Sequence, residues 1–156
     1  MKRSTIIISV TSRQTNSIKI GMVLSALISG NMSIYSSLNK PSLSPPTYIF
    51  PIVWTILYIL MGISSYIIYV SGNVNSAKAL KIYALQLFFN FCWSIIFFGF
   101  SQYLLAFIWL ILLIILIIIM IQRFYEINTF AASLQIPYLI WCIFAAFLNY
   151  TILMMN

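Results

Sequence analysis

Acidic side chains and histidine are nearly missing from this chain. Glu126 is its one acidic residue, and the sequence holds no histidine. General acid–base catalysis usually needs a tunable carboxylate or imidazole, and hydrolytic metal sites need histidine, cysteine or carboxylate ligands. We therefore predict no metal site and no cofactor. We expect function to rest on aromatic rings, amides, backbone and shape.

Cysteine and charge are scarce as well. Cys92 and Cys142 each lie inside an apolar run, which favours small packing residues over a disulfide or a metal pair. Charged residues make up 6% of the chain, against about 25% in a soluble domain. The net charge is +7, but the cations form no basic stripe or patch, so we predict no nucleic-acid partner.

Long apolar runs are what the chain has instead. Hydrophobic residues make up 63% of the sequence, and a run such as Leu104–Ile121 shows no alternation of polar and apolar positions. In lipid a backbone must satisfy its own hydrogen bonds, which leaves helices or a closed barrel, and barrel strands alternate. The chain is therefore predicted to be an all-α integral membrane protein, in contact with membrane lipid.

Five membrane spans are predicted, each near the ~20 residues that cross the hydrocarbon core. Turn residues separate the last four, and connections this short make sequential helices antiparallel neighbours. The expected architecture is a single transmembrane domain, residues 1–156, that forms a five-helix bundle. The predicted spans are roughly 5–29, 49–70, 79–98, 103–121 and 134–154.

The first of these spans has the weakest pattern. Arg13 and Lys19 lie between or within its apolar patches, but Gly21, Ser25 and Ser29 recur every four residues. That spacing puts small residues on one helix face, as close helix packing in lipid requires. The small-residue face is the reason to include this segment as a span.

Lysine and arginine are distributed unevenly between the two sides of the predicted bundle. Five spans place the termini on opposite sides, and the side of the N-terminus collects five cations, whereas the other holds only Lys40. By the positive-inside rule we expect the N-terminus in the cytoplasm and the C-terminus outside. Separately from this rule, we expect the membrane to be a bacterial or archaeal cell membrane. The five cations are Lys2, Arg3, Lys78, Lys81 and Arg123.

Three groups of polar and aromatic residues share helix faces inside the predicted spans. Polar side chains are costly in a span and usually face the bundle interior. The groups are Gln86, Asn90 and Trp93 on the third span, Trp141, Ala145 and Asn149 on the last, and Trp54 and Tyr58 on the second. One interpretation is that they line a ligand cavity with aromatic walls and orienting amides. The other is structural, since intramembrane amides often bond a neighbouring helix and aromatic residues often lie at the interface.

Prolines gather just before the second span. The segment Lys40–Pro46 has three prolines in seven residues, which excludes a helix and favours a stiff extended loop. Pro51 follows, where the first turn of a helix tolerates it. The segment is interpreted either as a lid over the mouth of the bundle or as a device that starts the helix.

Together these residues resemble the translocator protein family, also called tryptophan-rich sensory proteins or peripheral benzodiazepine receptors. The proline-rich loop, an N-x-x-W…F-F-G run and a P-Y-L-x-W…L-N pair occur in the same order and at the family's spacing. The matching stretches are LNKPSLSPPTYIFPIVWTILYILMGISSY (38–66), QLFFNFCWSIIFFG (86–99) and AASLQIPYLIWCIFAAFLNY (131–150). The likeness runs from about Gly21 to the C-terminus.

The resemblance implies five transmembrane helices around a ligand cavity, commonly in a homodimer. It implies binding of tetrapyrroles such as protoporphyrin IX and of benzodiazepine- or isoquinoline-type drugs. Bacterial members are described as degrading porphyrin in light, with two cavity tryptophans required, and these fall on Trp54 and Trp141. The other cavity positions fall on Tyr35, Tyr58, Asn90, Trp93 and Ala145.

Several positions depart from the family's pattern. Residues other than tryptophan stand where the family often has it, namely Ile34, Tyr48, Tyr69 and Leu153. The weak sterol-binding pattern needs a lysine or arginine after Tyr150, and TILMMN supplies none, so sterol recognition through it is not predicted.

The leading hypothesis is a membrane receptor and sensor for porphyrin-type ligands, with light-dependent porphyrin degradation as an activity to test. A transporter of tetrapyrroles or other amphipathic molecules is one alternative. The sequence shows no inverted repeat and almost no intramembrane ionisable residue for ion coupling, which disfavours active transport. A non-catalytic membrane scaffold is the other alternative.

Overall fold

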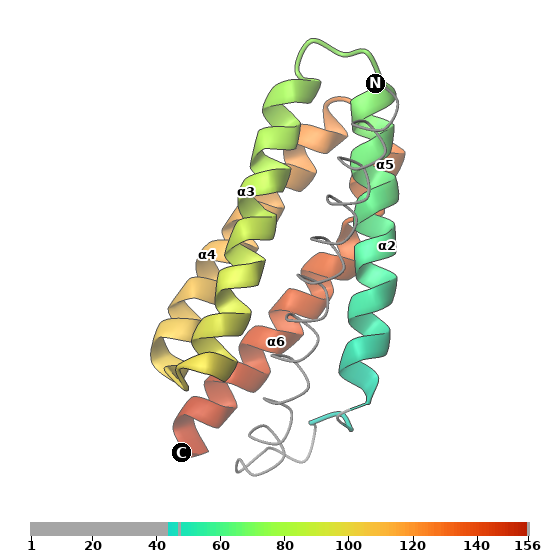
Figure 1. Cartoon of the computed structure of the whole chain (residues 1–156). Coiled ribbons are helices and arrows are strands. Elements are labelled where there is room, and N and C mark those ends of the chain that lie inside the picture. Colours follow the sequence, from blue (N-terminus) through green and yellow to red (C-terminus); the bar gives the residue numbers. More distant parts are fainter. Residues whose placement is uncertain (1–43, 47, 156) are drawn as a thin grey trace, which may run out of the picture. The chain divides into compact units, whose positions relative to one another are not determined.

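A computed structural model of the chain describes residues 44–46 and 48–155. The predicted span at 5–29, the site residue Tyr35, and Lys40 with most of the proline-rich segment lie outside the described residues. In the described part every regular element is a helix (Figure 1). The prediction of an all-α membrane protein is confirmed, with four long apolar helices among the described residues. The single five-helix domain stays a prediction.

The helices follow one another with short connections and run in alternating directions (Figure 1). A π-helical turn, η1, extends the second of them, and a short helix, α5, precedes the last. Their bounds are α2 Ile49–Val70, α3 Ser76–Ser94, η1 Ile95–Gly99, α4 Tyr103–Tyr125, α5 Thr129–Ser133 and α6 Ile136–Met155.

Proline and glycine mark several helix ends. Pro51 lies in the first turn of α2 and Pro137 in the first turn of α6, where a missing backbone N–H costs no helical hydrogen bond. Gly72 follows the last residues of α2 with a φ of 66°, a conformation that glycine adopts without steric cost. The Asn128 side chain caps α5 by accepting a hydrogen bond from the backbone N–H of Ala131.

The outer surface of these helices is apolar. On α2 alone Ile52, Ile56, Ile59 and Ile63 are each about half exposed. Water would make such a surface unfavourable, whereas lipid tails solvate it. Buried polar side chains lie inside instead, and they are Ser64, Ser76, Gln86, Asn90, Gln135 and Asn149. The apolar exterior and polar interior agree with a bundle that lies in a membrane.

Helix α4 forms extensive contacts with both α3 and α6. Trp109 of α4 stacks on Phe89 of α3 with ring centroids 4.6 Å apart, and its indole N–H donates to the Phe89 carbonyl. Helix α2 contacts α3 and α5 and meets α6 over few residues. The Ser64 hydroxyl of α2 donates to the Ala131 carbonyl of α5, at 2.7 Å, which ties α2 to this short helix.

Three helices differ in detail from the spans that hydropathy predicts. Helix α3 begins at Ser76, before the span predicted at 79–98, and η1 extends it to Gly99. The span predicted at 103–121 is part of a helix that continues to Tyr125, because a helix can extend past the hydrocarbon core with polar residues such as Gln122 and Arg123. The span predicted at 134–154 begins later, at Ile136. A turn at 134–135 separates α5 from α6, so Gln135 lies at the junction of the two helices.

Candidate functional site

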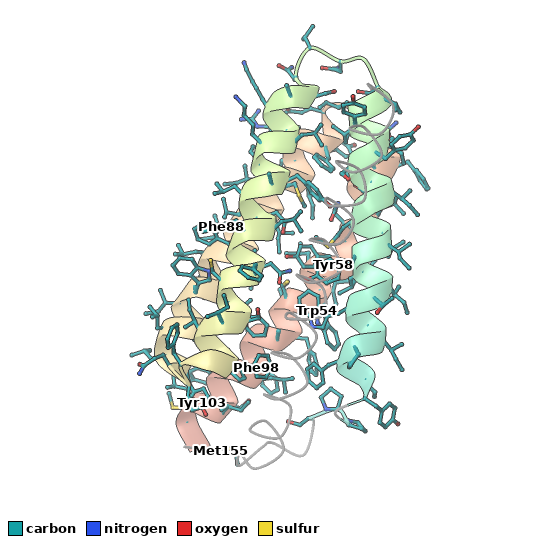
Figure 2. The ribbon with its side chains drawn as sticks, viewed as in Figure 1. Trp54, Tyr58, Phe88, Phe98, Tyr103 and Met155 are labelled. Carbon is teal, nitrogen blue, oxygen red and sulfur yellow. The ribbon has the colours of Figure 1, made fainter. Side chains whose placement is uncertain are left out.

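Two of the predicted site residues lie together on α2. Trp54 and Tyr58 are four residues apart, so they share a helix face, and their rings stack with centroids 5.5 Å apart at 28°. Figure 2 shows both rings pointing from α2 toward α6. Trp54 is half-buried and Tyr58 is 49% exposed, so this pair presents open aromatic surface.

Helix α6 supplies aromatic rings that meet those of α2. Tyr138 packs edge-on against Trp54, with centroids 6.3 Å apart. One turn later, Trp141 packs edge-on against Phe50 of α2 at 5.8 Å. Phe144 continues the row, 5.6 Å from Trp141. We call these residues of α2 and α6 the aromatic cluster; they are Phe50, Trp54, Tyr58, Tyr138, Trp141 and Phe144.

A buried hydrogen-bond chain connects this cluster to α3. The Asn90 amide N–H donates to the Tyr138 hydroxyl at 2.9 Å, and the Tyr138 hydroxyl donates to Gln86 Oε1 at 2.8 Å. Asn90 is 4% exposed, and Gln86 and Tyr138 are fully buried. The predicted polar face of the third span thus exists, and its two amides bind a tyrosine of another helix.

Several buried polar atoms have no hydrogen-bond partner among the described residues. Buried amides and indole N–H groups are nearly always paired, because an unpaired polar atom loses its hydration without compensation. The unpaired atoms are Ser44 Oγ, Gln86 Nε2, Trp93 Nε1, Gln135 Nε2, Gln135 Oε1 and Asn149 Oδ1. Three of them belong to two glutamines: Gln86 of α3, which binds the Tyr138 hydroxyl, and Gln135 in the turn just before α6.

The predicted site residues separate into two groups. Trp54, Tyr58 and Trp141 meet in the aromatic cluster, and Asn90 reaches it through Tyr138. Trp93 is buried further along α3, where its ring packs against Phe97 and Phe98 with centroids 5.6 and 6.2 Å away. The π-helical turn η1 carries both of these phenylalanines.

The remaining members of the predicted face on the last span lie beyond the cluster. Ala145 is half-buried one turn after Trp141, and its small side chain adds little bulk there. Asn149 is buried, and its amide N–H donates to the backbone carbonyl of Tyr103 at 3.0 Å. Asn149 therefore joins α6 to the start of α4, which is the structural role that the second interpretation gave to intramembrane amides.

Tyr138 is the most connected of the cluster residues that were not predicted from the sequence; Phe50 and Phe144 are the others. It stands in the motif PYLIW, three residues before Trp141, so helical spacing places the two on one face. That spacing was the available signal. Its hydrogen bonds to another helix could not be read from the sequence, because they depend on how α3 and α6 are placed.

The arrangement favours binding of a flat apolar ring. Indole and phenol faces stack on such rings, and amides beside them supply directional hydrogen bonds. Among the described residues no group of three metal-ligating side chains occurs. Glu126 lies outside the cluster, in an exposed ion pair with Arg123 at 3.2 Å.

Comparison with known proteins identifies the family. The model of the TspO/MBR family matches residues 15–155, a range that contains every described helix. The chain belongs to the TspO/MBR family. The resemblance seen in its motifs is thereby confirmed, and the aromatic cluster lies within the matched range.

Three relatives illustrate the similarity. "Tryptophan-rich protein TspO" of Chlorobaculum tepidum is 40% identical over 126 residues, which cover 78% of this chain and 78% of that protein. "Tryptophan-rich sensory protein" of Cereibacter sphaeroides is 35% identical over 122 residues, covering 78% and 76%. "Translocator protein" of Ovis aries is 39% identical over 119 residues, covering 74% and 70%. The chain is thus an integral membrane protein of the TspO/MBR family.

Proposed function

We propose that this TspO/MBR protein is a membrane receptor and sensor that binds porphyrin-type tetrapyrroles, such as protoporphyrin IX, and drug-like apolar ligands. The single observation that carries the proposal is the aromatic cluster, in which Trp54 of α2 packs against Tyr138 of α6 and Trp141 of α6 packs against Phe50 of α2. The name of the Cereibacter sphaeroides relative, a tryptophan-rich sensory protein, agrees with a sensory role.

The chemistry of the cluster supports a ring-shaped ligand over a hydrocarbon chain. Each stacked or edge-on aromatic contact is worth about 0.5–1.5 kcal/mol beyond the apolar area that it buries. The open faces of Trp54 and Tyr58 can take a further ring, while Asn90 and Gln86 hold Tyr138 in place beside them. A porphyrin is a flat apolar disc with this kind of complementary face.

Binding is tested by titrating the purified protein with protoporphyrin IX and following the shift of the Soret band. Replacing Trp54 or Trp141 by phenylalanine reduces the stacking area, and we expect each change to weaken binding about three- to tenfold. Trp109→Phe is the matched control, because Trp109 stacks on Phe89 between α3 and α4, away from the cluster. If the cluster variants bind like the parent and the control, the site assignment is wrong.

We further propose that the two cluster tryptophans take part in light-dependent degradation of the bound porphyrin. Indole is easily oxidised, so one electron can pass from Trp54 or Trp141 to the photo-excited ring, leaving an indole radical cation and a reduced porphyrin. This step needs no acid, base or metal. Both indoles belong to the aromatic cluster, where Trp54 contacts Tyr138 and Trp141 contacts Phe50.

Illumination of the porphyrin complex tests this activity. We expect the Soret absorbance to fall faster with the parent protein than with the Trp54→Phe/Trp141→Phe double variant, each measured at a porphyrin concentration that saturates it. The Trp109→Phe protein should behave as the parent. Equal rates in all samples and in protein-free detergent would show that the porphyrin is only photobleached in solution. This result would contradict the proposed degradation but not the proposed binding.

The orientation in the membrane is proposed from the charges. Lys78, Lys81 and Arg123 are exposed near the start of α3 and the end of α4, which the alternating helix directions bring to the same end. The positive-inside rule places this end in the cytoplasm, together with the N-terminus, and places the C-terminus outside. The homodimer that the family resemblance implies stays a prediction.

A further inference from the structure

The side chain of Gln135 is the most unusual polar group in the described interior. It is fully buried, and neither its amide nitrogen nor its amide oxygen has a hydrogen-bond partner. A second unpaired amide nitrogen belongs to Gln86, whose oxygen accepts from the Tyr138 hydroxyl. Two glutamines thus offer three unpaired amide atoms: two nitrogens that donate and one oxygen that accepts.

These atoms lie next to the aromatic cluster. Gln135 lies in the turn just before α6, three residues ahead of Tyr138, and its backbone carbonyl accepts the Leu139 N–H of the first turn of α6. Gln86 is joined to Tyr138 directly, at 2.8 Å, and the ring of Tyr138 packs against Trp54. The unpaired amide nitrogen of Gln86 is therefore one hydrogen bond away from a ring of the aromatic cluster, and Gln135 adjoins the same end of α6.

An unpaired buried amide is costly enough to require an explanation. A buried donor or acceptor without a partner loses its hydrogen bonds to water and gains nothing in return. Tyr138 satisfies only one of the four hydrogen-bonding positions of the Gln86 amide. A partner for these atoms must have chemistry that complements an amide.

We propose that Gln135 and Gln86 form a subsite for an uncharged carboxyl or carboxamide group of the ligand; this inference rests on the proposed function. Such a group pairs with the Gln135 amide at two points. Its carbonyl oxygen accepts from Gln135 Nε2, and its O–H or N–H donates to Gln135 Oε1. Gln86 Nε2 supplies a further donor to the same carbonyl oxygen.

The charged side chains of the described residues favour the uncharged form of this group. The lysines and the arginine among the described residues, Lys78, Lys81 and Arg123, are all exposed, so none is buried beside Gln135. An ionised carboxylate in this interior would lose its hydration without a cation to compensate. A protonated carboxyl group keeps both of its hydrogen-bonding atoms and carries no net charge.

The spacing along α6 suits a ring that carries a carboxyl side chain. Gln135 and Trp141 are six residues apart, which corresponds to about 9 Å along a helix. A flat macrocycle on Trp141 with a propionic acid arm spans a distance of this order. The porphyrin class that the subsite favours is therefore one with carboxyl-bearing side chains.

A series of three porphyrins with the same ring tests the subsite in the full-length protein in detergent. Protoporphyrin IX can donate and accept through its carboxyl groups, its dimethyl ester can only accept, and etioporphyrin has alkyl groups alone. At low pH, where the ligand carboxyls are protonated, we expect affinity to fall in that order, about three- to tenfold per step. As pH rises through the carboxyl pKa of the ligand, protoporphyrin IX should lose its advantage, whereas the other two should keep their affinities.

Substitutions then locate the preference. Gln135→Leu removes the amide at nearly constant volume. We expect the affinities of the three porphyrins for this variant to lie within about twofold of one another, while etioporphyrin binds as it does to the parent. Gln86→Met should remove part of the preference. Gln122→Leu is the matched control, because Gln122 is exposed on α4, and it should retain the whole preference.

The outcomes separate this inference from the function on which it rests. If none of the three porphyrins binds, the proposed function fails. If all bind but the acid has no advantage, or if the advantage survives in Gln135→Leu, the subsite is wrong. A Gln135→Leu protein with greater thermal stability and an unchanged ligand preference would show that the amides hold only internal water.

Discussion

Tyr138 combines ring packing and hydrogen bonding in one side chain. Its ring packs on Trp54, and its hydroxyl both accepts from Asn90 and donates to Gln86. The two interpretations of the intramembrane amides therefore meet at this residue. Asn90 and Gln86 do join helices, as structural amides would, and the tyrosine that they hold is part of the aromatic cluster.

Removing the hydroxyl of Tyr138 tests the structural part of this role. Tyr138→Phe leaves Asn90 Nδ2 and Gln86 Oε1 buried without partners, and we expect a loss of about 1–2 kcal/mol in the free energy of unfolding. The measurement is denaturant or thermal unfolding in detergent. Tyr66→Phe is the control, since Tyr66 is 65% exposed on α2. If both variants unfold with the parent, the hydrogen-bond chain does not contribute to stability.

The sequence was sufficient to predict some site residues and not others. Trp54, Tyr58, Trp141 and Asn90 are rare polar or aromatic groups at helical spacing inside apolar runs, so a pattern search finds them. Gln135 was not found, because it lies at the predicted start of a span, where amides usually meet water. Its burial results from the turn between α5 and α6, which no periodicity indicates.

At the scale of the elements, hydropathy predicts where the chain crosses the membrane better than where a helix ends. Helix α2 occupies Ile49–Val70, as predicted. Its ends are indicated both by the length of its apolar run and by proline and glycine near its two ends. Helix α4 continues past the apolar run to Tyr125. It ends where the backbone N–H groups of Ile127 and Asn128, in the connection to α5, donate to the Phe124 carbonyl, and hydropathy does not indicate these bonds.

The π-helical turn shows what local pattern cannot supply. The segment Ile95–Gly99 reads as continuous apolar helix, yet it adopts π-helical hydrogen bonding, and the chain then turns through Ser101 at a φ of 52°. Such turns insert an extra residue into a helix and rotate the side chains that follow. Here Phe97 and Phe98 both contact Trp93, so Trp93 belongs to a group of rings that is separate from the aromatic cluster.

At the scale of the whole molecule, the apolar exterior and the buried polar groups have one cause. Lipid solvates the isoleucine faces of the helices, so burial of apolar side chains drives their association only weakly, and packing and hydrogen bonds between helices gain importance. The bonds from Ser64 to Ala131, from Asn149 to Tyr103 and through Tyr138 each join two helices. Some of the polar side chains that join the helices, such as Gln86, therefore also contribute to the proposed ligand site.

The distribution of cations predicts the side on which each connection lies. In a background with Cys92 and Cys142 replaced by alanine, single cysteines at Val74 and Gln102 report the two ends of α3, because both positions are exposed. We expect a maleimide that cannot cross membranes to label Gln102→Cys in intact cells and Val74→Cys only in inverted vesicles. The reverse pattern would place Lys78 and Lys81 outside and overturn the orientation. Labelling of both from one side would show that α3 does not cross the membrane.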